Sequence, residues 1–266
     1  MYALEHPHRA HVASLGEGTP VALLVTLVTA WVAAQALGAL GWLPRRAVDI
    51  VGLAVAHGAL LGIAVAWTAR TARVQTWLPA ALLVAAGALG ALGLPGLLGY
   101  ALLPLWLVWL ARDGRVGWLR PAPAASILSG ALLGAVLGAH MLVGATLTLG
   151  HRISVPEVAA LLPWLAYDVG ANVPAGEGFF RGALFARAHR RWSLGAATAI
   201  STSLYVARYL LDPLLPSTLE LMAGAAFYLS LLGIANCWFF ARTGSAWPGL
   251  AASLLFFAAY RLLAPA

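Results

Sequence analysis

The stretch GEGFFRGALF, residues 176–185, places a carboxylate and a guanidinium four residues apart in apolar, glycine-rich surroundings. Glu177 and Arg181 would share one face of a helix, with the acid N-terminal to the base, which is the better orientation for a helical ion pair. We predict a buried pair with heavy atoms about 4 Å apart or less. Removing one partner would then cost roughly 3–5 kcal/mol, because the other charge would be left buried. The alternative is a solvated pair near a helix end, next to ARAHRRW at 186–192.

The elements that carry this pair must lie in a membrane. The chain has 266 residues, of which 62% are hydrophobic and 9% are charged. Soluble domains carry about 25% charged residues. A chain of this composition could not cover itself with water-compatible surface, so we predict an integral, multi-pass membrane protein.

Apolar segments of about 20 residues are long enough to cross a bilayer as helices. Segments with alternating hydrophobicity over about ten residues are absent, so membrane strands are not expected. We predict an all-α transmembrane helical bundle with about eight spans. The predicted spans are 20–43, 48–68, 77–111, 125–149, 156–175, 193–211, 217–241 and 246–263.

The segment 77–111 is too long for one ordinary span. Proline and glycine in GLPGLLGY, near Pro95, disrupt the helical hydrogen-bond ladder and predict two short helices or one broken helix. The chain is thus divided into a polar N-terminal segment at 1–19, N-terminal transmembrane helices at 20–150 and a C-terminal transmembrane core at 155–263. The distribution of arginine does not decide the orientation in the membrane.

All 16 basic residues are Arg, and they fall in short stretches between the spans. Arginine without lysine, together with abundant Ala, Leu and Gly, is typical of a GC-rich coding bias, and we expect a bacterial cytoplasmic membrane. Aromatic residues interleaved with a basic groove are absent, so nucleic acid is not an expected partner.

The single Cys237 is expected to be a small buried hydrophobe. Neither a metal nor another cofactor is expected.

Polar side chains within apolar spans usually face the interior of a bundle, because burying them against lipid is costly. His57 and His140 each stand alone among Gly, Ala and Leu, which favours hydrogen-bonded packing residues over metal ligands. Arg208 is expected to pair with an acid, either Asp212 one turn away or Glu177 as a tertiary partner. The remaining polar residues are Gln35, Asp168, Asn172, Glu177, Arg181 and Asn236.

Two further spacings bear on the helices. The small residues in LLGAVLGA, 132–139, predict close helix packing. Asp168 lies nine residues before Glu177, about 180° around an α-helix. Asp168 could therefore join Glu177 only if the helix breaks near Pro174 and Gly176.

From about residue 155 to 263 the chain resembles the CPBP family, which comprises CAAX-prenyl-type, bacteriocin-processing and abortive-infection intramembrane proteases. VPAGEGFFRGALF resembles its first motif, Glu-Glu-x-x-x-Arg-Gly. STSLYVARY falls where the family has Phe-x-x-x-His. ARTGSAWPGLAAS, residues 241–253, is a strong match to the family's Arg-Thr-Gly-Ser-x-Trp, which leads into a helix with His-x-x-x-Asn or Asp.

The resemblance implies a membrane peptidase whose first glutamate and histidines activate water, but this chain departs from the pattern. Glu177 and Arg181 match the second glutamate and the arginine. Other residues stand at the remaining motif positions: Gly176 for the first glutamate, Tyr205 for the phenylalanine, Tyr209 and Ser253 for the two histidines, and Phe256 or nearby Phe257 for the amide or carboxylate.

Hydrolysis needs a group that takes a proton from water and donors that hold the oxyanion. Gly, Ser and Phe cannot fill these roles, and no His follows His189.

Three function classes stay open. The first is a catalytically degenerate relative that binds a membrane-bound, prenylated or transmembrane peptide. The second is an active endopeptidase that uses Glu177, Asp168 and an N-terminal His. The third is a transporter-like bundle. We also expect Gly176, Tyr205, Tyr209 and Ser253 to surround one apolar cavity bordered by Glu177.

Overall fold

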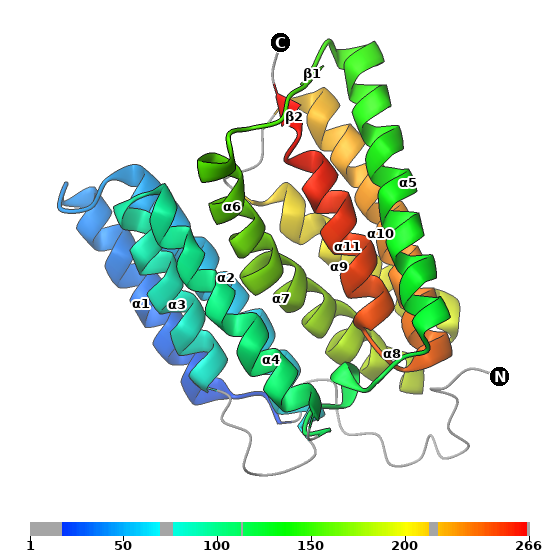
Figure 1. Ribbon diagram of the computed structural model, residues 1–266. Helices are drawn as coiled ribbons and strands as arrows, with labels where there is room; N and C mark the ends of the chain where they lie inside the picture. The colour runs from blue at the N-terminus through cyan, green and yellow to red at the C-terminus, as the bar shows by residue number, and fades with distance from the viewer. Residues whose placement is uncertain (1–17, 70–76, 113, 213–217, 265–266) are drawn as a thin grey trace. The chain divides into compact units, whose positions relative to one another are not determined.

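The computed structural model describes residues 18–69, 77–112, 114–212 and 218–264 (Figure 1). The predicted polar segment at 1–19 lies almost wholly outside the described residues. The chain forms two compact units that do not follow the chain order. The N-terminal unit contains Gly16–Val116 and Val158–Phe179, and the C-terminal unit contains Gly117–Glu157 and the residues from Phe180 onward. Each unit thus draws on both of the predicted transmembrane segments.

In the N-terminal unit, α2 packs against α1 and α3, and α6 packs against the 3₁₀ helix η2. The described elements of this unit are helical, and an isolated bridge joins Ala69 to Val116. Its elements are α1 (Val21–Ala39), α2 (Arg45–Thr68), α3 (Trp77–Leu92), η2 (Leu94–Ala101), α4 (Leu102–Arg112), α6 (Val158–Tyr167), the π-helix η4 (Asp168–Asn172) and α7 (Val173–Glu177).

In the C-terminal unit, α5, α10 and α11 lie side by side, and α9 packs against α10 (Figure 1). A two-residue antiparallel ribbon joins the chain after α5 to the chain after α11. The elements are η3 (Gly117–Leu119), α5 (Ala124–Leu149), β1 (Arg152–Ile153), α8 (Ala186–Arg191), α9 (Leu194–Leu210), α10 (Leu219–Thr243), α11 (Trp247–Tyr260) and β2 (Leu263–Ala264). The π-helix η5 (Gly178–Phe185) runs from one unit into the other.

The predicted interruption of the segment 77–111 is confirmed. The α-helix ends at Leu92, and a 3₁₀ helix with Pro95 in its first turn follows before α4 begins at Leu102. A side chain at Gly96 would overlap the carbonyl oxygen of Leu89, so only glycine allows the chain to fold back this closely on α3.

Helical backbone continues beyond the span predicted at 156–175, without a break from Val158 to Arg191. Instead of breaking near Pro174 and Gly176, the helix widens into π-turns at η4 and η5. A π-turn accommodates one extra residue and displaces the following face by about one residue, or 100°. The angle between Asp168 and Glu177 thereby falls from about 180° to about 80°.

Five helices of the described chain are long and apolar enough to cross a membrane. These are Val21–Ala39, Arg45–Thr68, Pro95–Arg112, Ala124–Leu149 and Leu219–Thr243, and shorter apolar helices cover Trp77–Leu92 and Trp247–Tyr260. The all-α membrane bundle is thus confirmed, and the predicted total of about eight spans includes helices shorter than a full crossing.

A stripe of glycines on α5 brings this helix into backbone contact with α11. Side chains at Gly130 and Gly134 would overlap the carbonyl oxygens of Pro248 and Ala252, and one at Gly138 would lie 2.6 Å from the Ala259 Cβ. The close packing predicted from the small residues is confirmed, because each of these glycines faces α11. This contact fixes the helix that carries Ser253 and Phe256.

Replacing Gly134 with leucine should therefore destabilise the C-terminal unit. The new side chain would have to push α11 away, at a cost of about 2 kcal/mol or more, which corresponds to about 5 °C in Tm. Gly195→Leu is the matched control, because nothing lies within 4 Å of a Cβ at that helical position. Thermal unfolding in detergent, followed by tryptophan fluorescence, measures both variants. Equal Tm values would contradict the packing.

Candidate functional site

Arg181 lies inside the C-terminal unit, with its side chain fully buried. Its guanidinium carbon stands 3.9 Å from the centre of the Tyr205 ring, a cation–π contact. On α10, a Cβ at Gly233 would come within 3.0 Å of Arg181 Nη2 and 2.8 Å of the Thr202 methyl group. Glycine therefore leaves the room that the guanidinium occupies. The arginine of the first motif and the aromatic residue of the second form one buried contact.

Aromatic rings continue from this contact across α9 to α11. Phe180 and Tyr205 meet edge to face with ring centres 5.5 Å apart, and Tyr205 and Tyr209 do so at 4.9 Å. Tyr209 then stacks on Phe257 at 5.2 Å, with the planes 27° apart. Offset and edge-to-face arrangements of this kind are the favourable ones for aromatic pairs. Tyr209, which stands where the family has a histidine, is held by rings on two sides.

Ser253, at the second histidine position, takes part in a polar contact between α10 and α11. Asn236 Nδ2 donates a hydrogen bond to Ser253 Oγ at 3.0 Å and a longer one to the Gly249 carbonyl oxygen at 3.4 Å. Asn236 and Ser253 are both buried. The amide therefore crosses the helix interface at the place where the motif has an imidazole.

The hydroxyl of Ser201 positions α9 against the π-helix. It donates a hydrogen bond of 2.7 Å to the carbonyl oxygen of Phe180, next to Arg181. Tyr205 lies one turn further along α9, on the same face as Ser201. Cys237 Sγ lies 3.7 Å from Ser201 Oγ and is buried, in agreement with the prediction of a small buried hydrophobe.

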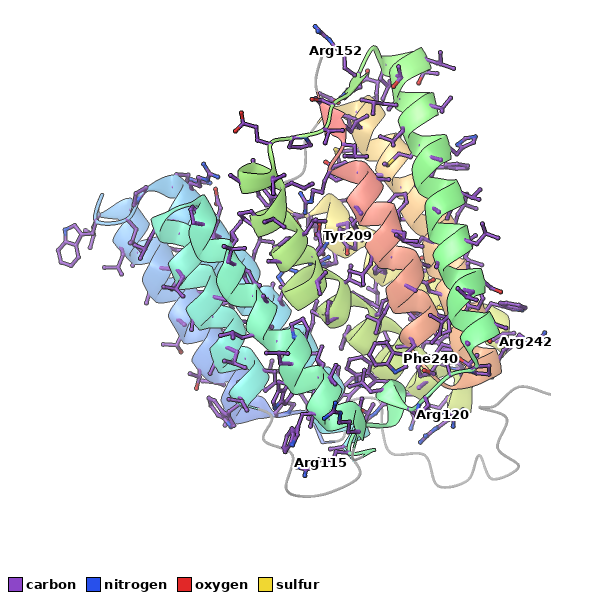
Figure 2. All side chains as sticks on the ribbon, viewed as in Figure 1. Arg115, Arg120, Arg152, Tyr209, Phe240 and Arg242 are labelled. Carbon is purple, nitrogen blue, oxygen red and sulfur yellow. The ribbon has the colours of Figure 1, made fainter. Side chains whose placement is uncertain are left out.

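The turn ARTGSAW between α10 and α11 is anchored by Arg120. Its guanidinium donates two hydrogen bonds to the Thr243 carbonyl oxygen, one of them 3.1 Å long, and Ser245 Oγ donates to the Arg120 carbonyl oxygen at 2.7 Å. Trp247 Nε1 donates to the Leu119 carbonyl oxygen at 3.1 Å. Figure 2 labels Arg120 at this end of the unit. The motif that leads into α11 is thus a structural clamp for the start of that helix.

The polar residues of the N-terminal unit form a second group. Glu177 is buried in α7, and Asp168 in η4 accepts a 3.0 Å hydrogen bond from Asn172 Nδ2. His57 on α2 is also buried: its Nδ1 lies 2.6 Å from the Leu53 carbonyl oxygen and its Nε2 lies 3.4 Å from the Tyr167 hydroxyl. The prediction that His57 is a hydrogen-bonded packing residue is confirmed.

His140 also has a hydrogen-bond partner, since its Nδ1 lies 2.7 Å from the hydroxyl of Tyr228 on α10. Arg208 lies over the ring of its neighbour Tyr209, with 4.1 Å between the guanidinium carbon and the ring centre. The expected pairing of Arg208 with an acid stays a prediction. Within the described residues, no group of three or more His, Cys, Asp or Glu side chains is placed to hold a metal ion.

A cavity of about 790 Å³ lies among α5, α9, α10 and α11 of the C-terminal unit. Its size falls within the usual range for small-molecule sites. Tyr209, Phe256 and Phe257 line it from the motif side, and His140 and Tyr228 line it from α5 and α10. Most of the lining is apolar. Of the residues that we expected to surround one cavity, Tyr209 lines this one, whereas Tyr205 and Ser253 are not among its lining residues.

The motif positions are thus divided between the units. Tyr205, Tyr209 and Ser253 are placed on α9 and α11 of one unit, whereas Gly176 and Glu177 belong to α7 of the other. The approach of Gly176 to this group and the Glu177–Arg181 distance stay predictions. Asn236 is a site residue that was not predicted from the sequence, although a lone amide in an apolar span is a usable signal.

Residues 158–259 match the family model described as type II CAAX prenyl endopeptidase Rce1-like. This match covers all three motif regions and confirms the resemblance to the CPBP family for that part of the chain. No curated protein gives a significant match. No solved structure gives a significant match.

A double-mutant cycle tests the contact between the retained arginine and the aromatic residue of the second motif. Arg181→Met and Tyr205→Leu should each destabilise the protein, and their coupling energy should be about 2 kcal/mol, because the guanidinium lies over the ring in a desolvated site. Tyr205→Phe keeps the ring face and should keep the coupling. Chemical unfolding in detergent measures the free energy of unfolding of the wild type, the two single variants and the double variant. Effects that add within about 0.5 kcal/mol would contradict the contact.

Proposed function

We propose that this integral membrane protein, whose residues 158–259 belong to the Rce1-like family, binds a membrane-associated peptide or protein segment without cutting it. The proposal rests on the side chains that stand at the two positions where the family has histidines, and on their contacts. Tyr209 stacks on Phe257, and Ser253 accepts a hydrogen bond from Asn236. Both side chains are engaged in packing and neither offers an imidazole.

Peptide hydrolysis at this place would need a group that removes a proton from water. Tyr209 is a poor base at neutral pH, because a tyrosine hydroxyl has a reference pKa of about 10. Ser253 has no adjacent imidazole to activate it, since no His follows His189 in the chain. Gly176 supplies no carboxylate where the family has its first glutamate. The residues that replace the motif therefore suit packing and binding better than catalysis.

The parts of the motifs that persist are those that hold the helices together. Arg181 stays buried over Tyr205, Gly233 leaves room for the guanidinium, and Arg120 clamps the turn that opens α11. A buried arginine has to be kept with its contacts, because losing them would leave a desolvated charge. This pattern supports a scaffold that is maintained while its hydrolytic groups are not.

The cavity beside Tyr209 supplies the binding surface in this proposal. It is lined by helices of a membrane protein, so a ligand that is already in the bilayer could reach it without passing through water. Its aromatic and aliphatic walls suit an apolar chain, such as a prenyl group or an apolar peptide segment. We place the protein in a bacterial cytoplasmic membrane, with lipid and such a client as partners and with no cofactor.

One observation favours a second candidate, an endopeptidase with a non-standard site in the N-terminal unit. There α2, which carries His57, packs against η4 and α7, which carry Asp168 and Glu177. The π-turn of η4 brings the faces of the two acids closer together than an α-helix would. Acids and a buried imidazole on neighbouring elements could serve as acid–base groups.

Cleavage assays separate the two candidates. We expect prenylated and transmembrane peptides to keep their full mass after incubation with the wild-type protein in nanodiscs. No cleavage that depends on Glu177 is expected. The triple variant Gly176→Glu, Tyr209→His and Ser253→His should gain some cleavage, because it restores the proton-transfer groups. Mass spectrometry of the recovered peptides measures both. Wild-type cleavage that disappears in Glu177→Ala and His57→Gln would overturn the proposal in favour of the second candidate.

A further inference from the structure

A hydrogen-bonded pair of polar side chains lies on the wall of the cavity in the C-terminal unit. His140 of α5 and Tyr228 of α10 both line the cavity, and 2.7 Å separate the imidazole Nδ1 from the hydroxyl oxygen. His140 is exposed and Tyr228 is half-buried. Gly144, one turn after His140, also lines the cavity, and a Cβ there would lie 3.2 Å from the Tyr228 hydroxyl oxygen. The missing side chain therefore leaves the hydroxyl open to a ligand in the cavity.

The pair lies deep in the part of the chain that crosses the membrane. α5 and α10 are each long and apolar enough to span a bilayer. His140 and Tyr228 lie about 5 Å from the middle of their helices along the axis, whereas half the hydrocarbon core is about 15 Å thick. Lipids offer acyl chains at this depth, and acyl chains form no hydrogen bonds. Polar side chains in such a place are costly and commonly mark functional sites.

The pair keeps hydrogen-bonding capacity after its two members have bonded to each other. A neutral imidazole carries one N–H and a tyrosine hydroxyl carries one O–H. If the hydroxyl donates to Nδ1, then Nε2–H remains as a donor and the hydroxyl oxygen as an acceptor. If Nδ1–H donates to the hydroxyl, then the O–H remains as a donor and Nε2 as an acceptor. In both tautomers the pair thus presents one donor and one acceptor.

We propose that the cavity binds a membrane-spanning peptide that carries one asparagine or glutamine near the middle of its apolar segment, and that this side-chain amide hydrogen-bonds with His140 and Tyr228. The inference rests on the proposed function and specifies its client. A carboxamide offers a carbonyl oxygen to the donor of the pair and an N–H to its acceptor. In the surrounding lipid the same amide would have no partner, so its transfer into the cavity is favourable. The apolar remainder of the client packs against Phe227, Phe256 and Phe257.

The test uses three fluorescent peptides with an apolar segment of about 20 residues. One has asparagine at the centre, the second has the same composition with the asparagine exchanged to one end, and the third has leucine in place of asparagine. Anisotropy measures their binding to the full-length protein in nanodiscs, at a peptide concentration too low for the peptides to associate with one another. The central-asparagine peptide should bind about fivefold tighter than the other two, because hydrogen bonds between membrane helices stabilise their association.

A double variant checks the location. His140→Phe with Tyr228→Phe keeps two aromatic rings and removes both polar groups, so the ratio of the affinities should fall to about one. Ser129→Ala is the control on the same helix, since the Ser129 hydroxyl donates to the Ala125 carbonyl oxygen and Ser129 is not among the residues that line the cavity. The two peptides of equal composition test the wild type by itself, so the inference can fail even if the double variant does not fold.

The outcomes are distinct. Equal affinities of the wild type for the three peptides overturn the amide preference and leave the proposed function standing. Absence of binding for all three peptides contradicts the proposed function itself. A preference for the central asparagine that persists in the double variant shows that the amide is bound elsewhere, and the assignment to His140 and Tyr228 is then wrong. If decylubiquinone binds in a manner that depends on the pair while no peptide does, the occupant is a carbonyl-bearing lipid and the peptide proposal is wrong.

Discussion

A buried guanidinium sets the constraint on which the C-terminal unit depends. Arg181 is fully enclosed among helices in a membrane protein, where an unsupported charge is costly. Tyr205 on α9 provides a ring face, and Gly233 on α10 provides space. Changing any of these residues alone would disturb the environment of the charge. The constraint gives a physical reason for Arg181, Tyr205 and Gly233 to occur together.

In the proposed function, the positions that depart from the family's pattern are those that transfer protons in that pattern. A histidine between helices also packs and forms hydrogen bonds, and other side chains can make contacts of these kinds. Tyr209 fills such a position by stacking on Phe257, and Ser253 fills another by accepting a hydrogen bond from Asn236. These contacts join α9, α10 and α11, and an apolar cavity lies beside Tyr209. In our proposal, the side chains at these positions serve packing and not proton transfer.

Much of this fold follows from local sequence signals. The composition predicts the membrane, the apolar lengths predict the helices, and Pro95 with its neighbouring glycines predicts the break after α3. The glycines of α5 predict a close helix contact, and they meet the backbone of α11. In each case the signal lies within a few residues of the feature, so the sequence can be interpreted without knowing which helices are neighbours.

Other features depend on contacts between distant residues. The long helix from Val158 to Arg191 exceeds its predicted length, because hydropathy marks charged residues as an end although Glu177 and Arg181 are buried within it. The π-turns have no simple residue pattern. The cavity joins positions as far apart as His140 and Phe257, and the amide of Asn236 meets Ser253 only after the chain reverses. Tertiary packing decided these features.

The central claim, that the protein holds a membrane peptide without cutting it, can be tested in one crosslinking measurement. A benzophenone-bearing phenylalanine analogue in place of Phe227, which lines the cavity, would capture a bound peptide on illumination in nanodiscs. Intact mass spectrometry then gives the mass of the adduct. We predict an adduct that carries the full-length peptide. Its mass should be the same however long the peptide is incubated with the protein before illumination. An adduct that carries only a fragment, with the remainder released into solution in a Glu177-dependent manner, would contradict the claim.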